Sequence, residues 1–251
     1  MFKSKNLFYL LLAVTISFSS CKKDEEEEDP TTPTASAPAN PIPAPAGADG
    51  ALVAVHTATY IDAPFVGEIY QPIGLGVAVF GNLSSGSFVN AGTVSLNSNN
   101  LAAQSNNSYV YTPSATSVSG IDLSSNIDWN VSGGNGFGAF TASPSNEIPS
   151  GPKYSGATTI ARTSAFTLSS STEIISADST IFSVISPTNT LIKVVAGNVQ
   201  SVEFSAAEMG TLGAGSGYVQ ITPYNYELQT LGGKQICLIN EAVNTTGVTF
   251  Q

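Results

Sequence analysis

Residues 217–231 read GYVQITPYNYELQTL, and most of this stretch alternates between apolar and polar side chains. Side chains two positions apart share one face of an extended strand, so the alternation predicts a long β-strand. The apolar positions shift by one residue at Pro223, between Ile221 before it and Tyr224 after it. Because proline cannot donate to a β-ladder, the shift predicts a β-bulge or a kinked edge strand at this point.

Segments with a similar strand signal fill most of the chain around this stretch. Turn-forming Asn, Gly and Pro residues separate them about every ten residues. Short strands at this spacing predict an all-β protein, and the pattern resembles one or two antiparallel, immunoglobulin-like β-sandwich domains. The predicted strands are 51–60, 74–81, 92–97, 108–112, 126–132, 138–142, 165–169, 172–177, 180–186, 190–196, 201–205, 217–231, 234–240 and 248–250.

The composition agrees with a β-rich protein. Apolar residues make up 42% of the chain, which is enough for a substantial core, while charged residues make up only 10%. Helix-rich soluble proteins place many Glu, Lys and Arg residues on their exposed faces, whereas Ser, Thr, Asn and Gly fill those positions here. Helix is therefore expected to be nearly absent. The exception is residues 206–212, where one helical turn would place Met209 and Leu212 at an end of the sandwich.

A Pro-rich segment divides the predicted strands into two series. Residues 143–155 contain three prolines and lie between strands, as an interdomain crossing would. The chain is therefore predicted to have a first β-sandwich domain at 48–142, a connecting segment at 143–163 and a second domain at 164–251. A single large β-domain is the alternative, because 231 residues after the first 20 fit either arrangement.

The first 20 residues have the organisation of a cleavable signal peptide. Lys3 and Lys5 are followed by a twelve-residue apolar stretch at 7–18 and by two serines. That apolar stretch is too short to span a bilayer in the mature protein. Together with Cys21 it resembles the lipobox of bacterial lipoproteins. The resemblance implies cleavage before Cys21 and acylation of this cysteine, which would anchor the chain stably in a membrane.

A short, strongly charged tract follows the cysteine. It resembles the start of Bacteroidota-type surface lipoproteins, in which such a tract directs export to the outer face of the outer membrane. A solvated charge run without an addressing role is the alternative. The implied export signal consists of Lys22, Lys23, Asp24, Glu25, Glu26, Glu27, Glu28 and Asp29.

Residues 30–47 complete a predicted tether that spans 21–47. They contain six prolines and no charge, so they favour extended polyproline II conformation and cannot bury a core. Eighteen residues in that conformation reach about 55 Å. The tether is therefore expected to hold the β-domains away from the membrane.

The charge distribution excludes several classes of partner. From Pro30 onward the chain has four basic residues against twelve carboxylates. Nucleic acid is excluded because its recognition requires a basic surface that neutralises phosphates. Peripheral docking on anionic membrane surfaces is excluded on the same grounds. The expected partners are the membrane through the lipid anchor, and a glycan or another surface protein.

No catalytic residue, metal site or cofactor is predicted. His56 is the only histidine and lies within a predicted strand, so a structural role is favoured over a catalytic one. Residues 122–128 have oxygen-bearing side chains but match no calcium-loop template. A glycosidase needs only two facing carboxylates, and that possibility stays open. The carboxylates considered are Asp62, Glu68, Asp122, Asp128 and Glu147.

Aromatic residues of the first series are the candidates for ligand binding. Trp129, Tyr109 and Tyr111 would stack on sugar rings if they were exposed beside polar neighbours. The favoured alternative for Trp129 is a core tryptophan, because apolar residues flank it on its own strand face. Ser179 lies in a tripeptide, Asp-Ser-Thr, that resembles an O-glycosylation acceptor of the same bacterial group. Cys237 lies in an apolar strand and is expected to be a buried, inert thiol.

These observations predict a lipid-anchored cell-surface protein without enzymatic activity. Its expected role is binding or scaffolding, with a glycan or an envelope protein as partner. A carboxylate-based glycan hydrolase and a purely structural spacer are the alternatives, because fold alone does not distinguish among them.

Overall fold

The computed structural model describes residues 10–11, 39–40, 47–63, 65–83 and 85–251. Most of the predicted signal peptide, the lipidation site Cys21, the acidic tract and most of the tether lie outside the described residues. None of the helical structure in the described ranges is long and apolar enough to cross a membrane.

The fold is almost entirely β-structure, with 55% strand and 2% helix, which confirms the all-β, sandwich-type prediction. The elements are β1 (Leu10–Leu11), β2 (Ala39–Asn40), β3 (Gly50–Ala63), β4 (Gly67–Asn82), β5 (Ser87–Phe88), β6 (Val94–Leu96), β7 (Asn99–Asn100), β8 (Ala102–Ala103), β9 (Tyr109–Tyr111), β10 (Trp129–Val131), β11 (Phe140–Ala142), β12 (Thr159–Ile160), β13 (Phe166–Ser169), β14 (Ser179–Ile185), β15 (Thr190–Ala196), β16 (Ser201–Phe204), α1 (Ala206–Met209), β17 (Gly215–Leu231) and β18 (Lys234–Phe250).

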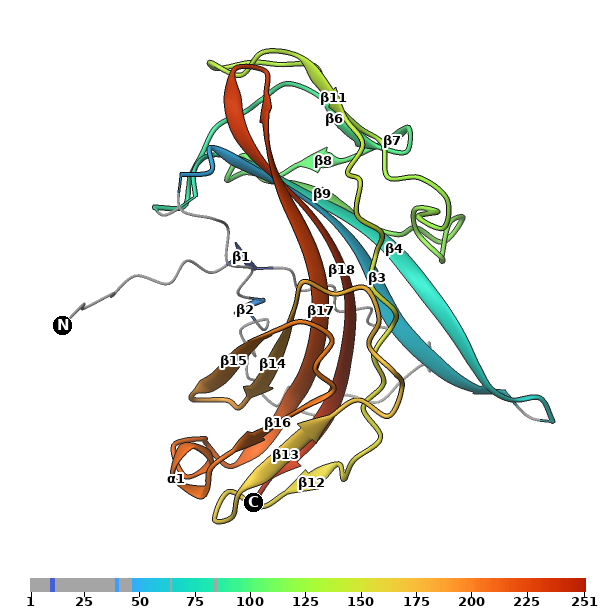
Figure 1. Cartoon of the computed structure of the whole chain (residues 1–251), viewed down its shortest axis with the longest axis vertical. Helices are drawn as coiled ribbons and strands as arrows, with labels where there is room; N and C mark the ends of the chain where they lie inside the picture. The colour runs from blue at the N-terminus through green and yellow to red at the C-terminus, as the bar shows by residue number, and fades with distance from the viewer. Residues whose placement is uncertain (1–9, 12–38, 41–46, 64, 84) are drawn as a thin grey trace, which may run out of the picture.

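A ten-stranded sheet forms the centre of the molecule (Figure 1). Its strand order is β15-β14-β17-β18-β3-β4-β9-β8, with β12 also on β18 and β5 also on β4. Its strands pair antiparallel except for β18 with β3 and β12 with β18, which are parallel. A four-stranded sheet, β11-β10-β6-β7, and a two-stranded sheet, β13-β16, form separate layers.

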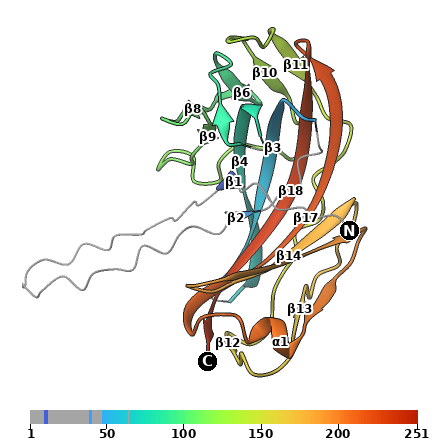
Figure 2. The ribbon, with the colours of Figure 1, turned by 90° about the vertical axis from the view of Figure 1, so that its left-hand side faces the viewer.

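The β17–β18 hairpin runs through both ends of the molecule (Figure 1, Figure 2). Each strand has 17 residues, and their pairing keeps one register from Gly215↔Phe250 to Leu231↔Lys234. The two-residue turn is formed by Gly232 and Gly233, both at positive φ, as the tight turns of hairpins require. A side chain at Gly232 would also collide with the carbonyl oxygen of Gly138, which would lie 2.4 Å from its Cβ atom.

The bulge or kinked edge strand predicted at Pro223 is wrong. Strand β17 lies between β14 and β18, and its register is the same at Ile221↔Asn244 and Tyr224↔Glu241. All residues from 219 to 225 are buried, so both faces of the strand are covered there. Ile221 and Tyr224 belong to different hydrophobic clusters. The apolar pattern therefore changes face because Ile221 packs into the cluster on one side of the sheet and Tyr224 into the cluster on the other side, without an inserted residue.

Two hydrophobic cores lie on one side of the ten-stranded sheet. The upper core is enclosed between this sheet and the four-stranded sheet, and includes Leu52, Phe80 and Trp129. The lower core lies between the same sheet and the β13–β16 layer, and includes Phe182 and Phe204. A third cluster, with Val53, Val77 and Cys237, lies on the opposite face, because neighbouring residues of a strand point to opposite sides.

Helix α1 closes the end of the lower core. Ser205 and Glu208 form a capping box, in which the Ser205 hydroxyl accepts from Glu208 N and the Glu208 carboxylate accepts from Ser205 N at 2.7 Å. Met209 and Leu212 are buried in the lower core, which confirms the position predicted for them.

The two cores divide the chain near the predicted domain boundary, but the β17–β18 hairpin contributes to both. Ile236 and Leu238 pack in the upper core, whereas Val248 and Phe250 pack in the lower core. The central sheet is continuous between them. The division into domains at 48–142 and 164–251 stays a prediction.

Candidate ligand-binding site

A row of buried asparagines holds the connecting segment against the central sheet. Asn225 on β17 donates to the carbonyl oxygen of Glu147 at 2.8 Å, and Asn240 on β18 donates to that of Asn146. Asn244 on β18 accepts a 2.9 Å hydrogen bond from the backbone nitrogen of Tyr154. A segment outside any strand leaves its backbone groups without ladder partners, and these amides satisfy them. They fix residues 143–154 where the chain passes between the cores.

The predicted strand at 172–177 is also wrong. These residues form a loop beside the connecting segment, to which they are joined by side-chain bonds. Ser150 donates to Glu173 O at 2.7 Å and accepts from Ile175 N at 2.8 Å, while Thr172 donates to Gly151 O at 3.0 Å. Within the segment Ile174 is buried in the lower core whereas Ile175 is exposed, so the apolar residues do not form one face of a strand.

Asn97 positions the loop at residues 122–128. It lies in the turn between β6 and β7, at a φ of 46° that asparagine tolerates better than most residues. Its amide nitrogen donates to the carbonyl oxygens of Asp122 at 2.6 Å and Asn126 at 2.7 Å. Its amide oxygen accepts from the backbone nitrogen of Asp128 at 2.7 Å. One side chain therefore holds both ends of the loop.

This loop separates two hollows in the surface. The inner hollow, of about 440 Å³, lies between the loop and residues 143–148, and His56 is among its lining residues. The outer hollow, of about 660 Å³, lies over the four-stranded sheet. Ser95, Asn130 and Thr141 line it from three adjacent strands, paired directly across the sheet. Asp128 lines both hollows.

Two titratable groups that line the hollows, Asp122 and His56, have pKa values shifted by their surroundings. Ser124 donates through its hydroxyl at 2.6 Å and its backbone nitrogen at 2.9 Å to Asp122, and these bonds lower the pKa of that carboxyl. Burial lowers the pKa of His56, against a smaller opposing effect of Asp122. The carboxylate is therefore ionised and the imidazole neutral. Asp128 accepts a 2.5 Å bond from the hydroxyl of Ser143.

The hollows are suited to hydrogen bonding. Most of their lining side chains are Ser, Asn, Thr or Asp, which offer hydroxyl, amide and carboxylate groups. A ligand with many hydroxyl groups matches such a surface, because each hydroxyl both donates and accepts. Acid catalysis does not match Asp122, because a general acid needs a raised pKa and this one is lowered.

The other predicted carboxylates lie in different places. Glu147 lines the inner hollow with Asp128, whereas Asp122 and Asp128 both line the outer one. Glu68 lies on β4 and forms an ion pair with Lys153 at 2.6 Å. Asp62 lies opposite Glu68 in the β3–β4 pairing, and its side chain is outside the described part. The structure thus brings three of the five together around the two hollows.

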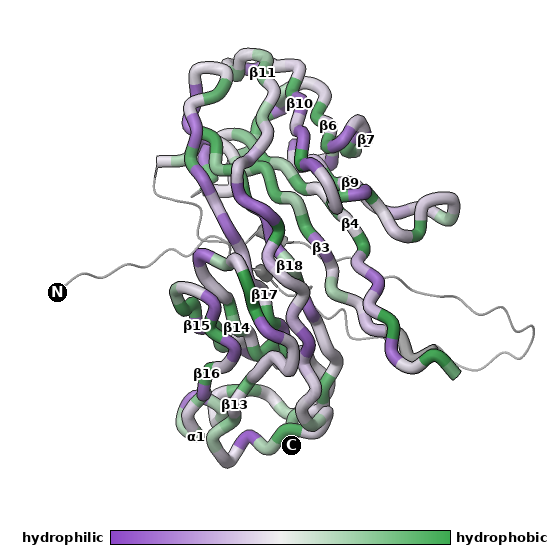
Figure 3. The backbone as a smooth tube through the Cα atoms, turned by 45° about the vertical axis from the view of Figure 1, so that its right-hand side comes forward, coloured by the Kyte–Doolittle hydropathy of each residue, from purple (hydrophilic) through white to green (hydrophobic). Residues whose placement is uncertain are grey.

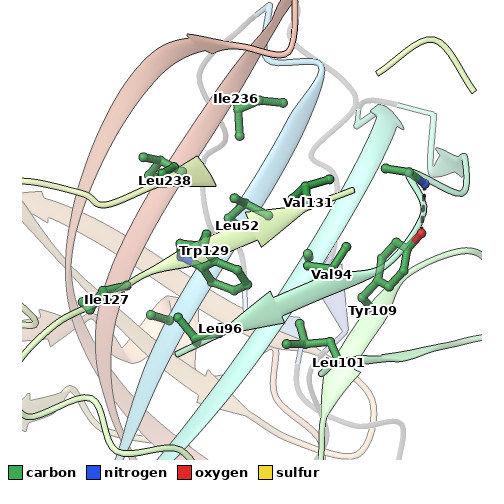
Figure 4. Close-up of a cluster of buried hydrophobic side chains, with 14 of the residues drawn as sticks. Leu52, Val94, Leu96, Leu101, Tyr109, Ile127, Trp129, Val131, Ile236 and Leu238 are labelled. Atoms are coloured by element: carbon green, nitrogen blue, oxygen red, sulfur yellow. Dashed lines mark hydrogen bonds between the residues drawn. The ribbon is translucent and has the colours of Figure 1, made fainter. Parts of the chain in front are cut away.

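The aromatic residues predicted to bind ligand are mostly in the upper core (Figure 4). Trp129 and Tyr109 are each 1% exposed, which confirms the core interpretation of Trp129. The hydroxyl of Tyr109 accepts from Ala91 N at 2.9 Å and donates to the carbonyl oxygen of Gly92 at 2.9 Å. Tyr111 is partly buried against the same core. Stacking of these rings on a ligand stays a prediction, and for Trp129 and Tyr109 it would require the ring to leave the core.

Two further predicted residues lie on central strands. Ser179 begins β14, opposite Tyr224 of β17, and its glycosylation stays a prediction. Cys237 on β18 is fully buried, and burial raises the pKa of its thiol to about 12. The thiol is therefore protonated and shielded, as the sequence predicted.

Sequence reasoning missed the asparagines that build the hollows. The sequence indicated a turn at residues 97–100. It did not show that the Asn97 amide bonds to a loop 25 or more positions away. In the described ranges no group of three or more His, Cys, Asp or Glu side chains has the arrangement of a metal site. No family model, curated protein or solved structure matches the chain.

Proposed function

We propose that this chain is a lipid-anchored cell-surface protein that binds a polyhydroxylated ligand, with a glycan as the expected class. The anchor rests on the sequence around Cys21, and outward display on the outer membrane rests on the acidic tract that ends at Asp29. Residues 30–47 would serve as the tether. The β-structure would then be the displayed binding module.

The outer hollow is the proposed binding surface. The observation that carries this proposal is the row formed by Ser95, Asn130 and Thr141, which presents two hydroxyls and an amide in register across three strands. The ionised carboxylate of Asp122 adds a strong acceptor for ligand hydroxyls. Strand-borne groups are held rigidly, which reduces the entropy lost on binding.

A carboxylate-based glycan hydrolase remains the second candidate. It is favoured by the presence of two carboxylates on the walls of each hollow, Asp122 and Asp128 in one and Asp128 and Glu147 in the other. The lowered pKa of Asp122 weighs against it, because one member of the pair must hold a proton. A structural spacer is the third candidate.

A glycan array probed with the full chain, followed by calorimetry on any positive glycan, tests the proposal. Thr141→Val removes one hydroxyl from the outer hollow at constant shape and is expected to weaken binding roughly fivefold, the value of one hydrogen bond. Thr167→Val is the matched control, because Thr167 is also an exposed strand residue, in β13 of the other layer. Equal effects of the two changes would contradict the assignment to the outer hollow. Release of reducing sugar that is lost in Asp128→Asn would support the hydrolase instead.

A further inference from the structure

The β3–β4 hairpin extends beyond its neighbouring strands as a finger (Figure 1). Strand β18 pairs with β3 only as far as Thr57, and the outer neighbours of β4 end at the bridge between Gly74 and Gly120. The distal finger, residues 58–63 and 65–72, is a two-stranded ribbon in one register up to Ala63↔Gly67. In the pairing of the described residues, neither edge of the distal finger has a further strand.

The apex of the distal finger is apolar and exposed, and its end is green in Figure 3. Phe65 is fully exposed and Val66 is 74% exposed, with Ile69 and Tyr70 next to them at 44% and 42%. Phe65 also has a φ of 70°, which is unusual for an aromatic residue and strains the backbone. Exposed apolar side chains gathered at one place mark an interaction surface.

The middle of the distal finger and the level just behind its apex are fastened to the connecting segment. Lys153 pairs with Glu68 at 2.6 Å and lies 5.2 Å from the centre of the Tyr60 ring. The rings of Tyr60 and Tyr70 contact each other at 5.2 Å, and the Tyr60 hydroxyl donates to Gly151 O at 3.1 Å. The direction of the apex relative to the sheet is therefore fixed by side-chain contacts.

Addition of another β-strand to β4 is disfavoured by Pro72. Both backbone groups of Gly74 point away from β3, because its nitrogen donates to Ser119 O and its oxygen accepts from Ile121 N, each at 2.9 Å. Backbone direction alternates along a strand, so Pro72 also faces the outer edge and has no N–H to offer. A strand added to the outer edge of β4 would therefore lack one backbone hydrogen bond at Pro72, which favours the apex as the contact surface.

The order of groups along the distal finger matches the layers of a lipid surface. Apolar Phe65 and Val66 come first, the Lys153–Glu68 ion pair follows, and the Tyr60–Tyr70 pair comes next. At about 3.3 Å per residue the ion pair lies roughly 7–10 Å behind the apex, which is the depth of interfacial insertion. Tyrosines favour the headgroup level of the membrane–water interface, so this pair would lie at its outer part.

We propose that the distal finger inserts Phe65 and Val66 into a zwitterionic lipid surface. Lys153 and Glu68 present charges of both signs at headgroup level, and Asp62, opposite Glu68 in the β3–β4 pairing, adds a second acidic residue at that level. Charges of both signs fit a phosphocholine or phosphoethanolamine layer, because its headgroups also carry both signs. Anionic lipid would be repelled by a chain with a formal net charge of −10. A second copy of the chain is disfavoured as the occupant by the same repulsion.

Fluorescence from a tryptophan at the apex tests this proposal on the full chain. The chain has one tryptophan, Trp129, which is buried, so Phe65→Trp adds a reporter at the apex against a shielded background. Val118→Trp is the matched control, because Val118 is 65% exposed outside the distal finger. The probe is a phosphatidylcholine vesicle that contains phosphatidylcholine brominated on its acyl chains, which quenches only tryptophans in contact with the acyl region.

The expected result is strong quenching and a blue shift for Phe65→Trp, with little change for Val118→Trp or the parent chain. Vesicles of phosphatidylglycerol should give less quenching. Because the readout is local, attachment through any other part of the chain does not produce the expected difference. Equal quenching at the two positions, or no quenching at position 65, would overturn the proposal, the latter in favour of a protein pocket. Circular dichroism should show that Phe65→Trp leaves the fold unchanged.

Discussion

Asn97 and Asp128 are joined by two hydrogen bonds although they lie 31 positions apart. Asp128 N donates to the amide oxygen of Asn97 at 2.7 Å, and Asn97 N donates to Asp128 O at 2.8 Å. This pair fixes the wall between the inner and outer hollows. The shape of the proposed binding surface therefore depends on a side chain in a β-turn.

Asn97→Gly should destabilise the protein and loosen the 122–128 loop. Glycine accepts the positive φ, so the change isolates the loss of the side-chain amide. Because this amide forms three hydrogen bonds, the free energy of unfolding should fall by about 2–3 kcal/mol. Urea denaturation measures the free energy of unfolding, and ligand affinity at the outer hollow should fall with it. Asn106→Gly, in another exposed turn, is the control and should cost much less.

Stability should fall on acidification below pH 6.5, partly because of His56. Its pKa is lowered from 6.5 in the folded protein, so below that pH the unfolded chain binds a proton that the folded protein does not. The free energy of unfolding then falls as pH decreases from 6.5 towards the folded pKa. His56→Gln should flatten this part of the profile, as measured by thermal unfolding between pH 5 and 8. An unchanged slope would contradict a half-buried, neutral His56.

Acidic residues extend the same trend to lower pH. The pKa values of Asp122 and Glu208 are lowered from 3.8 and 4.5 by hydrogen bonds from Ser124 and Ser205. Their contributions are present above those ordinary values and are lost as the pH falls through the folded ones. Ser124→Ala should raise the pKa of Asp122, which a titration followed by NMR of the carboxyl carbon would detect.

Replacement of Trp129 should separate packing from hydrogen bonding. The indole nitrogen is buried and has no hydrogen-bond partner among the described residues. Trp129→Phe removes this unsatisfied donor and keeps an aromatic ring, so it should cost much less than Trp129→Ala, for which about 3–5 kcal/mol is typical. Chemical denaturation of both variants measures the difference. Equal losses would show that the indole donor has a partner in solution.

Cys237 should react with thiol reagents only after unfolding. Its thiol is buried, and with a pKa of about 12 it carries almost no thiolate at neutral pH. The measurement is the rate of reaction with a disulfide reagent in a Cys21→Ala background, where Cys237 is the sole cysteine. Reaction as fast as that of a free thiol before denaturant is added would contradict this burial.

The alternation of side chains was sufficient to predict most strands and the buried side of Trp129. It located the shift of apolar positions between Ile221 and Tyr224 but predicted the wrong cause, because both residues are buried and only the layers around β17 distinguish them. The long-range hydrogen bonds of the asparagines could not be predicted from the sequence either. Asn240 in a strand and Asn97 in a turn carry no local sign of the segments that their amides reach.

The long β17–β18 hairpin has a mechanical consequence. Its strands are shared by the upper and lower cores, so neither core can melt without fraying a strand that the other requires. We expect the two halves to unfold as one cooperative unit, because both pack on the same hairpin. A pull applied through the predicted tether would enter at β3, cross to β18 through their parallel ladder, and be shared by the whole sheet rather than by one half of it.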